Sequence, residues 1–186
     1  MSIPKLPAGI SDPGIEVFRD NEGRVFFLKE GTKLPYLMMP TEYREYFQSE
    51  LAADKTALAV IKKEFGLITA DEQEEMFAGC RYGNLDYRAD LLDGKLTYDA
   101  PRCSIISTCP GFNVICRIPI PPNGSLTRSE YRIVILISQG KQTKEISNIL
   151  GISDATVRTH IQRIHSKLGV NNNIEVASWA HEHRII

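Results

Sequence analysis

The chain has 186 residues, a length that fits one ordinary domain or two small ones. With 42% hydrophobic and 24% charged residues, its composition is that of a soluble globular protein and excludes wholesale disorder. No apolar run approaches the roughly 18–20 residues that span a bilayer, and the N-terminus lacks a secretory signal pattern. We therefore expect a cytoplasmic protein with no membrane partner. The net charge of -1 gives no sign of nucleic-acid binding, because proteins of that class are commonly basic.

The charges are unevenly distributed along the chain. Residues 125–186 carry 8 Lys and Arg against 5 Asp and Glu, whereas residues 1–124 carry 14 against 18. All four histidines lie in the second part and all four cysteines in the first. Between them, residues 119–125 hold three prolines and a glycine, which neither a helix nor a central strand could contain. The sequence predicts an N-terminal domain over 1–118, a linker over 119–125 and a second domain over 126–186.

The first elements of the N-terminal domain indicate an α+β fold. Residues 24–28 and 34–38 are typical of a short strand pair around Glu30-Gly31, in which Pro35 allows only an edge position. A long helix is predicted from Thr41 to about Phe65, ended by Gly66. Thr69-x-x-Glu72 begins another helix that runs to about Phe77. From residue 79 onward Gly, Asp, Asn and Pro predominate, so we expect a loop-rich stretch.

Four cysteines lie within 37 residues of this stretch, at Cys80, Cys103, Cys109 and Cys116. In a reducing cytosol such a group favours a metal or redox role over disulfides. Four thiolates around Zn²⁺ form a closed tetrahedral site that helps a segment to fold, and an iron–sulfur cluster uses the same ligands. The spacing lacks the C-x-x-C pair of a zinc ribbon, and buried thiols that pack as small apolar groups are the alternative. For the four cysteines we favour a structural zinc ion over an iron–sulfur cluster.

The sequence does not indicate an enzyme. The acidic residues of the N-terminal domain are spread over a helix and a loop without the spacing of a cation site, and no histidine is present there to pair with a cysteine nucleophile. We therefore expect no catalytic residues.

The second domain has start and stop signals for four short helices. Thr127-x-x-Glu130 begins the first, which Gly140 ends, and Thr143 caps a second over 144–150. After the Gly151-Ile152 turn, Ser153 caps a third helix that runs to about Leu168 and carries an apolar stripe (Val157, Ile161, Ile164, Leu168). The opposite face of that helix is polar and basic, and a fourth helix contains Ile174, Val176, Ala177 and Trp179.

Two helices joined by a Gly-containing turn, the second with a basic polar face, describe a helix-turn-helix. The major groove of DNA admits one α-helix, and Arg, Gln and Thr can read base edges there. A small helical bundle with a merely solvated charged face remains open on periodicity alone.

The residues of this domain resemble the helix-turn-helix module shared by LuxR, NarL and GerE regulators. The match is carried by Leu126-Thr127-x-x-Glu130, Gly140, Lys144-Glu145-Ile146, Leu150-x-Ile152-Ser153, Thr156-Val157-Arg158-x-His160 and Lys167-Leu168-Gly169-Val170-x-Asn172. The sequence differs from the family pattern at Ser129, Arg132, Ser147 and Asn173. The fold expected for the whole chain is therefore mainly α with a small β part: an α+β domain followed by an all-α four-helix module.

The resemblance implies roles for individual residues. It places Arg158, Thr159 and Gln162 against bases, and Lys144, Ser153, Arg163 and Lys167 near phosphates. It gives the last helix a dimer contact, for which the candidates are Val176, Trp179 and Ala180, while core packing is the alternative for Trp179. The implied function is a sequence-specific transcriptional regulator that binds double-stranded DNA as a homodimer and contacts RNA polymerase.

The resemblance also implies that residues 1–124 hold a sensing or interaction domain. They lack the acidic pair, mid-domain Asp and late Lys of a phosphorylated receiver, and they contain no phosphate-binding loop. Two alternatives stay open: a protein-interaction adaptor that no longer binds DNA, and a redox or iron sensor that uses the four cysteines.

Overall fold

The computed structural model describes residues 6–10 and 12–185, and these divide into two compact units. The N-terminal unit contains the described residues up to Pro101 together with Pro110–Arg117. The C-terminal unit contains Arg102–Cys109 and the described residues from Ile118 onward. Residues 102–109, which fall inside the expected domain 1–118, thus pack with the C-terminal unit. The predicted fold class is confirmed, because an α+β unit with a loop-rich stretch precedes a helical one.

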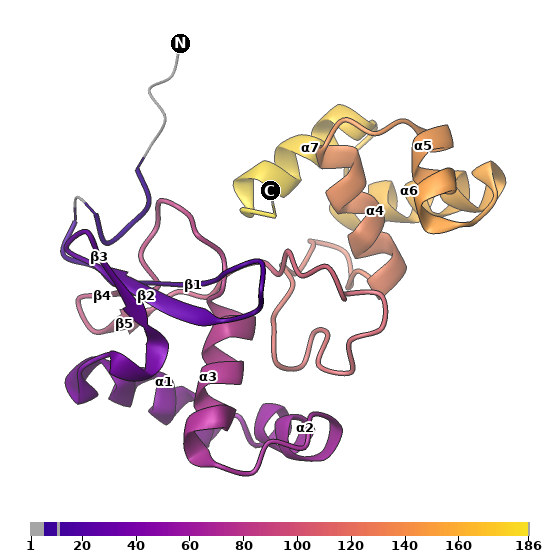
Figure 1. The fold of residues 1–186 in the computed structure, drawn as a ribbon. Coiled ribbons are helices and arrows are strands. Elements are labelled where there is room, and N and C mark those ends of the chain that lie inside the picture. Colours follow the sequence, from indigo (N-terminus) through magenta and orange to yellow (C-terminus); the bar gives the residue numbers. More distant parts are fainter. Residues whose placement is uncertain (1–5, 11, 186) are drawn as a thin grey trace. The chain divides into compact units, whose positions relative to one another are not determined.

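A three-stranded antiparallel sheet begins the N-terminal unit, with the strand order β1-β2-β3 (Figure 1). Its strands are β1 (Glu16–Arg19), β2 (Val25–Lys29) and β3 (Thr32–Pro35). Glu30 (φ 50°) and Gly31 (φ 75°) form the two-residue turn between β2 and β3, and such a left-handed pair matches the twist of a hairpin. The strand pair around this turn and the edge position of Pro35 are confirmed. The second strand was predicted over 34–38, but it begins earlier, at Thr32, and ends at Pro35, because Tyr36–Met38 form a 3-10 helix, η1.

Three helices follow: α1 (Thr41–Ala53), α2 (Lys55–Glu64) and α3 (Ala70–Arg81). The prediction of one long helix to Phe65 is wrong, because Asp54 leaves helical geometry and its carboxylate accepts a hydrogen bond from the Ala57 N–H at 3.0 Å. An Asp in that position caps a new helix. The predicted start of α3 is confirmed by a capping box between Thr69 and Glu72, but α3 continues past Phe77 to Arg81.

The core of the N-terminal unit lies between the sheet and these helices, with α3 packed on β1 and β2. It includes Phe47 and Tyr82, whose rings meet edge to face at 5.1 Å. Arg81 is fully buried there: its guanidinium donates to Glu50, to Asp54 and to the carbonyl oxygens of residues 114 and 115. This one side chain therefore fastens the returning segment 110–117 to the helices.

A short hairpin lies in the stretch that was expected to be loop. Its strands are β4 (Leu91–Leu92) and β5 (Lys95–Leu96), joined by Asp93 and Gly94, both with positive φ. An isolated bridge joins Ile15 to Leu91. Strands of two residues are too short to show periodicity, which explains why the sequence did not reveal them.

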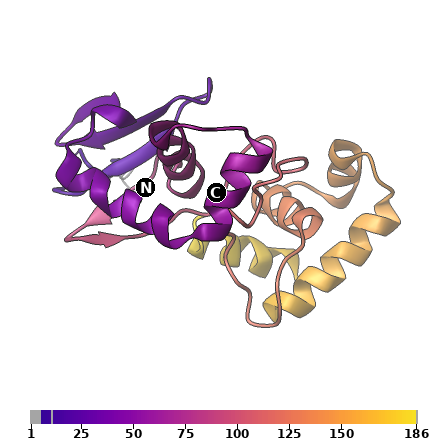
Figure 2. The same ribbon diagram turned by 90° about the horizontal axis from the view of Figure 1, so that it is seen from below.

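The C-terminal unit is helical: α4 (Arg128–Ser138), α5 (Thr143–Leu150), α6 (Asp154–Leu168) and α7 (Asn173–Glu182). Helix α4 packs on α6 and α7, and α5 packs on α6 (Figure 2). Their contacts bury a common core that includes Ile133, Ile146, Ile164 and Val176. No helix in the described part of the chain is both long enough and apolar enough to cross a membrane.

Candidate nucleic-acid interface

The turn between α5 and α6 fixes these two helices as a pair. Gly151 ends α5 in the left-handed region (φ 66°), and the Ile152 N–H donates to the Ser147 carbonyl oxygen at 3.1 Å. Left-handed backbone is costly for any residue with a Cβ, so glycine suits this position. On the far side of the turn, the Ser153 hydroxyl accepts from the Thr156 N–H at 3.1 Å and caps α6 as predicted.

One side-chain bond crosses the turn as well. The Ser147 hydroxyl donates to the Asp154 carboxylate, which joins α5 to the first turn of α6. Ser147 is one of the positions at which the sequence departs from the family pattern, and here it makes a buried polar contact. A second such position, Asn173, lies 3.1 Å from Nε2 of His165 through its side-chain oxygen.

The start of α5 differs by one residue from the prediction. Thr143 is its first helical residue, and Gln142 is the cap, whose N–H donates to the Glu145 carboxylate at 2.9 Å. Lys144 is exposed in the first turn of this helix. Backbone N–H groups at a helix start favour anions, so an exposed lysine there suits a phosphate neighbour.

Helix α6 has two sharply different faces. The predicted apolar stripe is confirmed, because Val157, Ile161, Ile164 and Leu168 are buried. Arg158, Thr159, Gln162 and Arg163 are exposed. Since successive residues turn by about 100°, Arg158 and Gln162 lie within roughly 40° of each other on one face. The Thr159 hydroxyl donates to the Ala155 carbonyl oxygen at 3.0 Å, which leaves its oxygen able to accept. The structure thus brings the three predicted base-reading side chains together on an exposed surface.

Lys167 is placed differently from the other predicted phosphate contacts. Its ammonium lies 2.6 Å from a carboxylate oxygen of Glu130 on α4, whose side chain is only 2% exposed. The same carboxylate accepts from the Thr127 N–H at 2.7 Å. Burial acts to raise the pKa of Glu130, but the hydrogen bonds from Lys167 and Thr127 outweigh it, so the pKa is lowered. Lys167 therefore holds α6 to α4, a role that the sequence pattern did not reveal.

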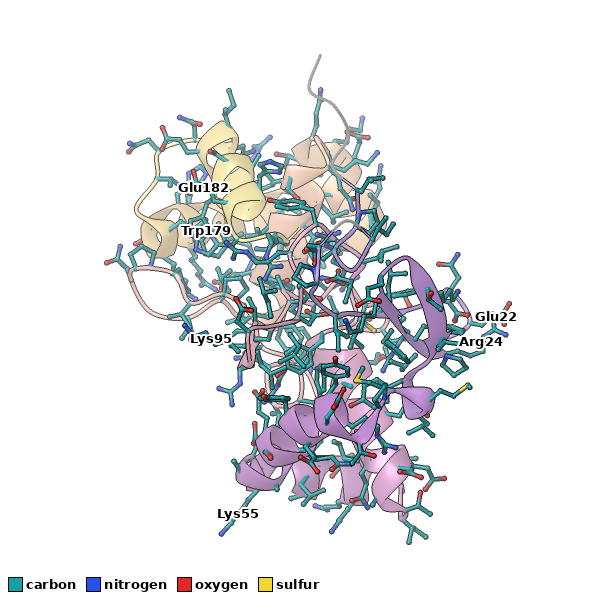
Figure 3. The ribbon with its side chains drawn as sticks, turned by 90° about the vertical axis from the view of Figure 1, so that its left-hand side faces the viewer. Glu22, Arg24, Lys55, Lys95, Trp179 and Glu182 are labelled. Carbon is teal, nitrogen blue, oxygen red and sulfur yellow. The ribbon has the colours of Figure 1, made fainter. Side chains whose placement is uncertain are left out.

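The three candidates for a dimer contact are buried inside the unit. Val176 and Ala180 have no exposed surface, and Trp179 is 8% exposed, with its ring stacked on that of His183 at 4.2 Å. Figure 3 labels Trp179 on α7. Core packing, the alternative for Trp179, is what the structure shows. These side chains pack against α4, so they cannot also form a surface for a second chain. On α7 the large apolar residue that is exposed is Ile174, at 83%. Dimerisation itself stays a prediction.

The linker is attached to the end of α6. The Asn123 N–H donates to the Lys167 carbonyl oxygen at 2.9 Å, and its side-chain amide donates to the Ser166 carbonyl oxygen at 3.2 Å. The last carbonyl groups of a helix lack partners within it, so Asn123 caps the helix from outside. The prolines and the glycine predicted a linker here, but the contact of Asn123 with the end of α6 could not be predicted from the sequence.

Residues 102–109 are attached to the helices of the same unit by arginines. Arg128 of α4 donates to the carbonyl oxygens of Ser107 at 3.1 Å and Cys109 at 2.8 Å. Arg102 donates to the carbonyl oxygen of Arg184 at 3.0 Å. The second unit is therefore more than the contiguous domain 126–186 that the sequence predicts.

The four cysteines divide between the units. Cys80 and Cys116 lie in the N-terminal unit, half-buried and buried, whereas Cys103 and Cys109 lie in the C-terminal unit, exposed and half-buried. Among the described residues, no group of three or more His, Cys, Asp or Glu side chains is arranged to hold a metal ion. The side chains as placed thus do not fit the predicted site, and metal binding stays a prediction.

The geometry of α5, the turn and α6 defines a helix-turn-helix domain. Residues 124–180 match the model of the family described as bacterial regulatory proteins, luxR family, so this segment is a LuxR-family helix-turn-helix domain.

Curated relatives agree over the same region. The chain is 43% identical over 65 residues to the transcriptional regulatory protein LiaR of Bacillus subtilis, which covers 35% of this chain and 31% of LiaR. It is 37% identical over 60 residues to the nitrate/nitrite response regulator protein NarL of Escherichia coli, 32% of this chain and 28% of NarL. A third relative, the uncharacterized response regulatory protein YgeK of Escherichia coli, is 43% identical over 58 residues, 31% of this chain and 40% of YgeK. The chain thus spans less than a third of the length of LiaR and NarL.

Proposed function

We propose that the protein is a transcriptional regulator that binds double-stranded DNA in a sequence-specific manner through α6. The observation that carries this proposal is the exposed face of Arg158, Thr159 and Gln162 above a fully packed apolar stripe, within a LuxR-family domain. The names of LiaR and NarL, a transcriptional regulatory protein and a response regulator, support it.

The proposed mechanism has two parts. Lys144 and Arg163, both exposed, neutralise phosphates and give binding that does not depend on sequence. Arg158, Thr159 and Gln162 reach base edges in the major groove and supply the specificity. Ser153, at the start of α6, lies where helix N–H groups can hold a phosphate oxygen. Lys167 is not included among the proposed phosphate contacts, because its ammonium forms an ion pair with the Glu130 carboxylate.

The proposal extends to the oligomeric state, the protein partner and the cellular location. A small domain with a few phosphate contacts gains affinity by binding two half-sites as a homodimer. Such a regulator works in the bacterial cytoplasm, on the chromosome, where it contacts RNA polymerase. The N-terminal unit, with its own core, acts as the sensing or interaction domain.

The test is DNA binding by the full-length protein. Duplexes selected from a random pool would give a preferred sequence, and affinity would then be measured for that duplex and a scrambled one at two salt concentrations. We expect Arg158→Ala to reduce the preference by about 1–3 kcal/mol while binding to the scrambled duplex changes little. Arg163→Ala should weaken both duplexes alike. Arg88→Ala, an exposed arginine of the N-terminal unit, is the control for charge and should change neither. Failure to bind either duplex at low salt would instead favour a protein-interaction adaptor.

A further inference from the structure

Three carboxylates are buried together in the N-terminal unit, outside the proposed DNA-binding surface. Glu16 and Asp90 have no exposed surface, and Asp99 is 3% exposed. Glu16 belongs to β1, whereas Asp90 and Asp99 belong to residues 83–99, which we call the 83–99 segment. Asp86, half-buried in the same segment, is the fourth acid of this carboxylate cluster.

The cluster holds the 83–99 segment against β1. The Val17 N–H of β1 donates to Oδ2 of Asp90 at 2.7 Å, and the Asp86 N–H donates to Oε1 of Glu16 at 2.6 Å. The two bonds run in opposite directions between strand and segment. Backbone bonds between Ile15 and Leu91, at 2.9 and 3.1 Å, lie beside them. The carboxylates are thus part of the seam that covers the free edge of β1.

One carboxylate oxygen of Asp90 accepts no hydrogen bond from the described residues. Its Oδ1 is buried and has no hydrogen-bond partner among the described residues. Burial raises the pKa of Asp90 well above its ordinary value, and the charges of Asp99 and Glu16 raise it further, with a smaller effect from Asp86. The charge of Asp90 also contributes to the raised pKa of Tyr82, which directly follows α3 and whose hydroxyl donates to Glu50.

A proton is the ligand that suits these observations. An ionised carboxylate is costly in a dry interior when one of its oxygens accepts no hydrogen bond, and adjacent carboxylates cannot all ionise at once. When Asp90 is protonated at Oδ1, that hydroxyl can donate a hydrogen bond to a neighbouring carboxylate, while Oδ2 still accepts one from the Val17 N–H.

We propose that the carboxylate cluster is a proton-controlled clasp, in which a proton on Asp90 holds the 83–99 segment against β1 and its loss releases the segment. Release follows because deprotonation leaves like charges facing one another across the seam. The chain continues from this segment into residues 102–109, which belong to the C-terminal unit, and then returns to the N-terminal unit over residues 110–117. This inference goes beyond the proposed function and does not depend on DNA binding.

The experiment uses the full-length protein labelled with ¹³C and ¹⁵N. Side-chain carboxyl signals would be followed by NMR from pH 4 to 9, and amide exchange of the 83–99 segment would be measured at pH 6.0 and 8.5, corrected for the intrinsic pH dependence of exchange. Asp90→Asn keeps an oxygen for Val17 and places an amide donor at Oδ1, so it imitates the protonated form. Asp93→Asn, exposed in the turn of the same segment, is the matched control, and Glu16→Gln serves if Asp90→Asn does not fold.

We expect one carboxyl group to titrate well above the usual range of a carboxyl group, and corrected exchange in the segment to be at least about tenfold faster at pH 8.5 than at 6.0. Asp93→Asn should behave like the natural protein, whereas Asp90→Asn should lose both the titration and the acceleration. In Glu16→Gln the titration should move to lower pH. Carboxyl groups that all titrate below pH 5, or acceleration that persists in Asp90→Asn, would overturn the proposal.

Discussion

Replacing Lys167 with methionine gives a sharp test of how the DNA-binding unit is held together. The substitution keeps most of the length of the side chain and removes its charge, so Glu130 keeps its bond from Thr127 but loses its cation. Removing one partner of a buried ion pair typically costs about 3–5 kcal/mol. The Glu130 side chain is 2% exposed but that of Lys167 is 25% exposed, and solvent screening weakens the pair, so we expect a loss at or just below the lower limit of that range, about 2–3 kcal/mol.

The chain contains a single tryptophan, Trp179, which is buried in the C-terminal unit. Its fluorescence during a urea titration therefore reports the unfolding of that unit alone. The double variant Glu130→Gln with Lys167→Met should recover most of the lost stability, because a neutral pair leaves no unpaired charge. A loss below about 0.5 kcal/mol for Lys167→Met would refute this account of the ion pair and return Lys167 to the predicted phosphate contacts.

The remaining predictions concern pH, the turn and the cysteines. Because the pKa of Glu130 is lowered by folding, its contribution is present above its unfolded pKa of about 4.3 and is lost as the pH falls further. Trp179 fluorescence should therefore show a steeper loss of stability below about pH 4.5 in the natural protein than in Glu130→Gln, and equal slopes would contradict it. Gly151→Ala forces a left-handed residue and should cost about 1–2 kcal/mol by the same assay, and a neutral result would mean that the turn is not the one described. For the cysteines, metal analysis of anaerobically purified protein tests the zinc that the sequence predicts: about one zinc per chain with no visible absorbance would support it, although the side chains as placed do not form the site. Visible absorbance would indicate an iron–sulfur cluster, and absence of metal would mean that the cysteines bind neither.

The sequence predicted the C-terminal unit well because its signals are local. Capping residues such as Thr127 and Ser153 act on backbone groups three positions away, and the apolar stripe of α6 repeats within the helix. Those features allowed the helix bounds to be predicted within a residue or two. They also allowed the exposed face of α6 to be predicted. The ion pair between Lys167 and Glu130 joins residues 37 positions apart, so no local pattern could show that this lysine is paired with a carboxylate.

The N-terminal unit was harder to predict because its order depends on distant partners. Strand β1 contains only four residues and follows a Pro- and Gly-rich stretch, so it has little periodicity of its own, yet it pairs along its length with β2. Asp54 was interpreted as one more helical residue, although its capping bond to Ala57 is local; its other partner, Arg81, lies 27 positions away and could not be predicted. Asp90 and Glu16 are 74 positions apart and looked like scattered surface acids, whereas folding buries both.

The central claim is that the exposed face of α6 reads DNA sequence. The most direct measurement is the affinity of the full-length protein and of Arg158→Ala for the same selected and scrambled duplexes at one salt concentration. The account predicts that the natural protein prefers the selected duplex, and that Arg158→Ala loses about 1–3 kcal/mol of that preference. Equal weakening of both duplexes, or no weakening of either, would contradict it.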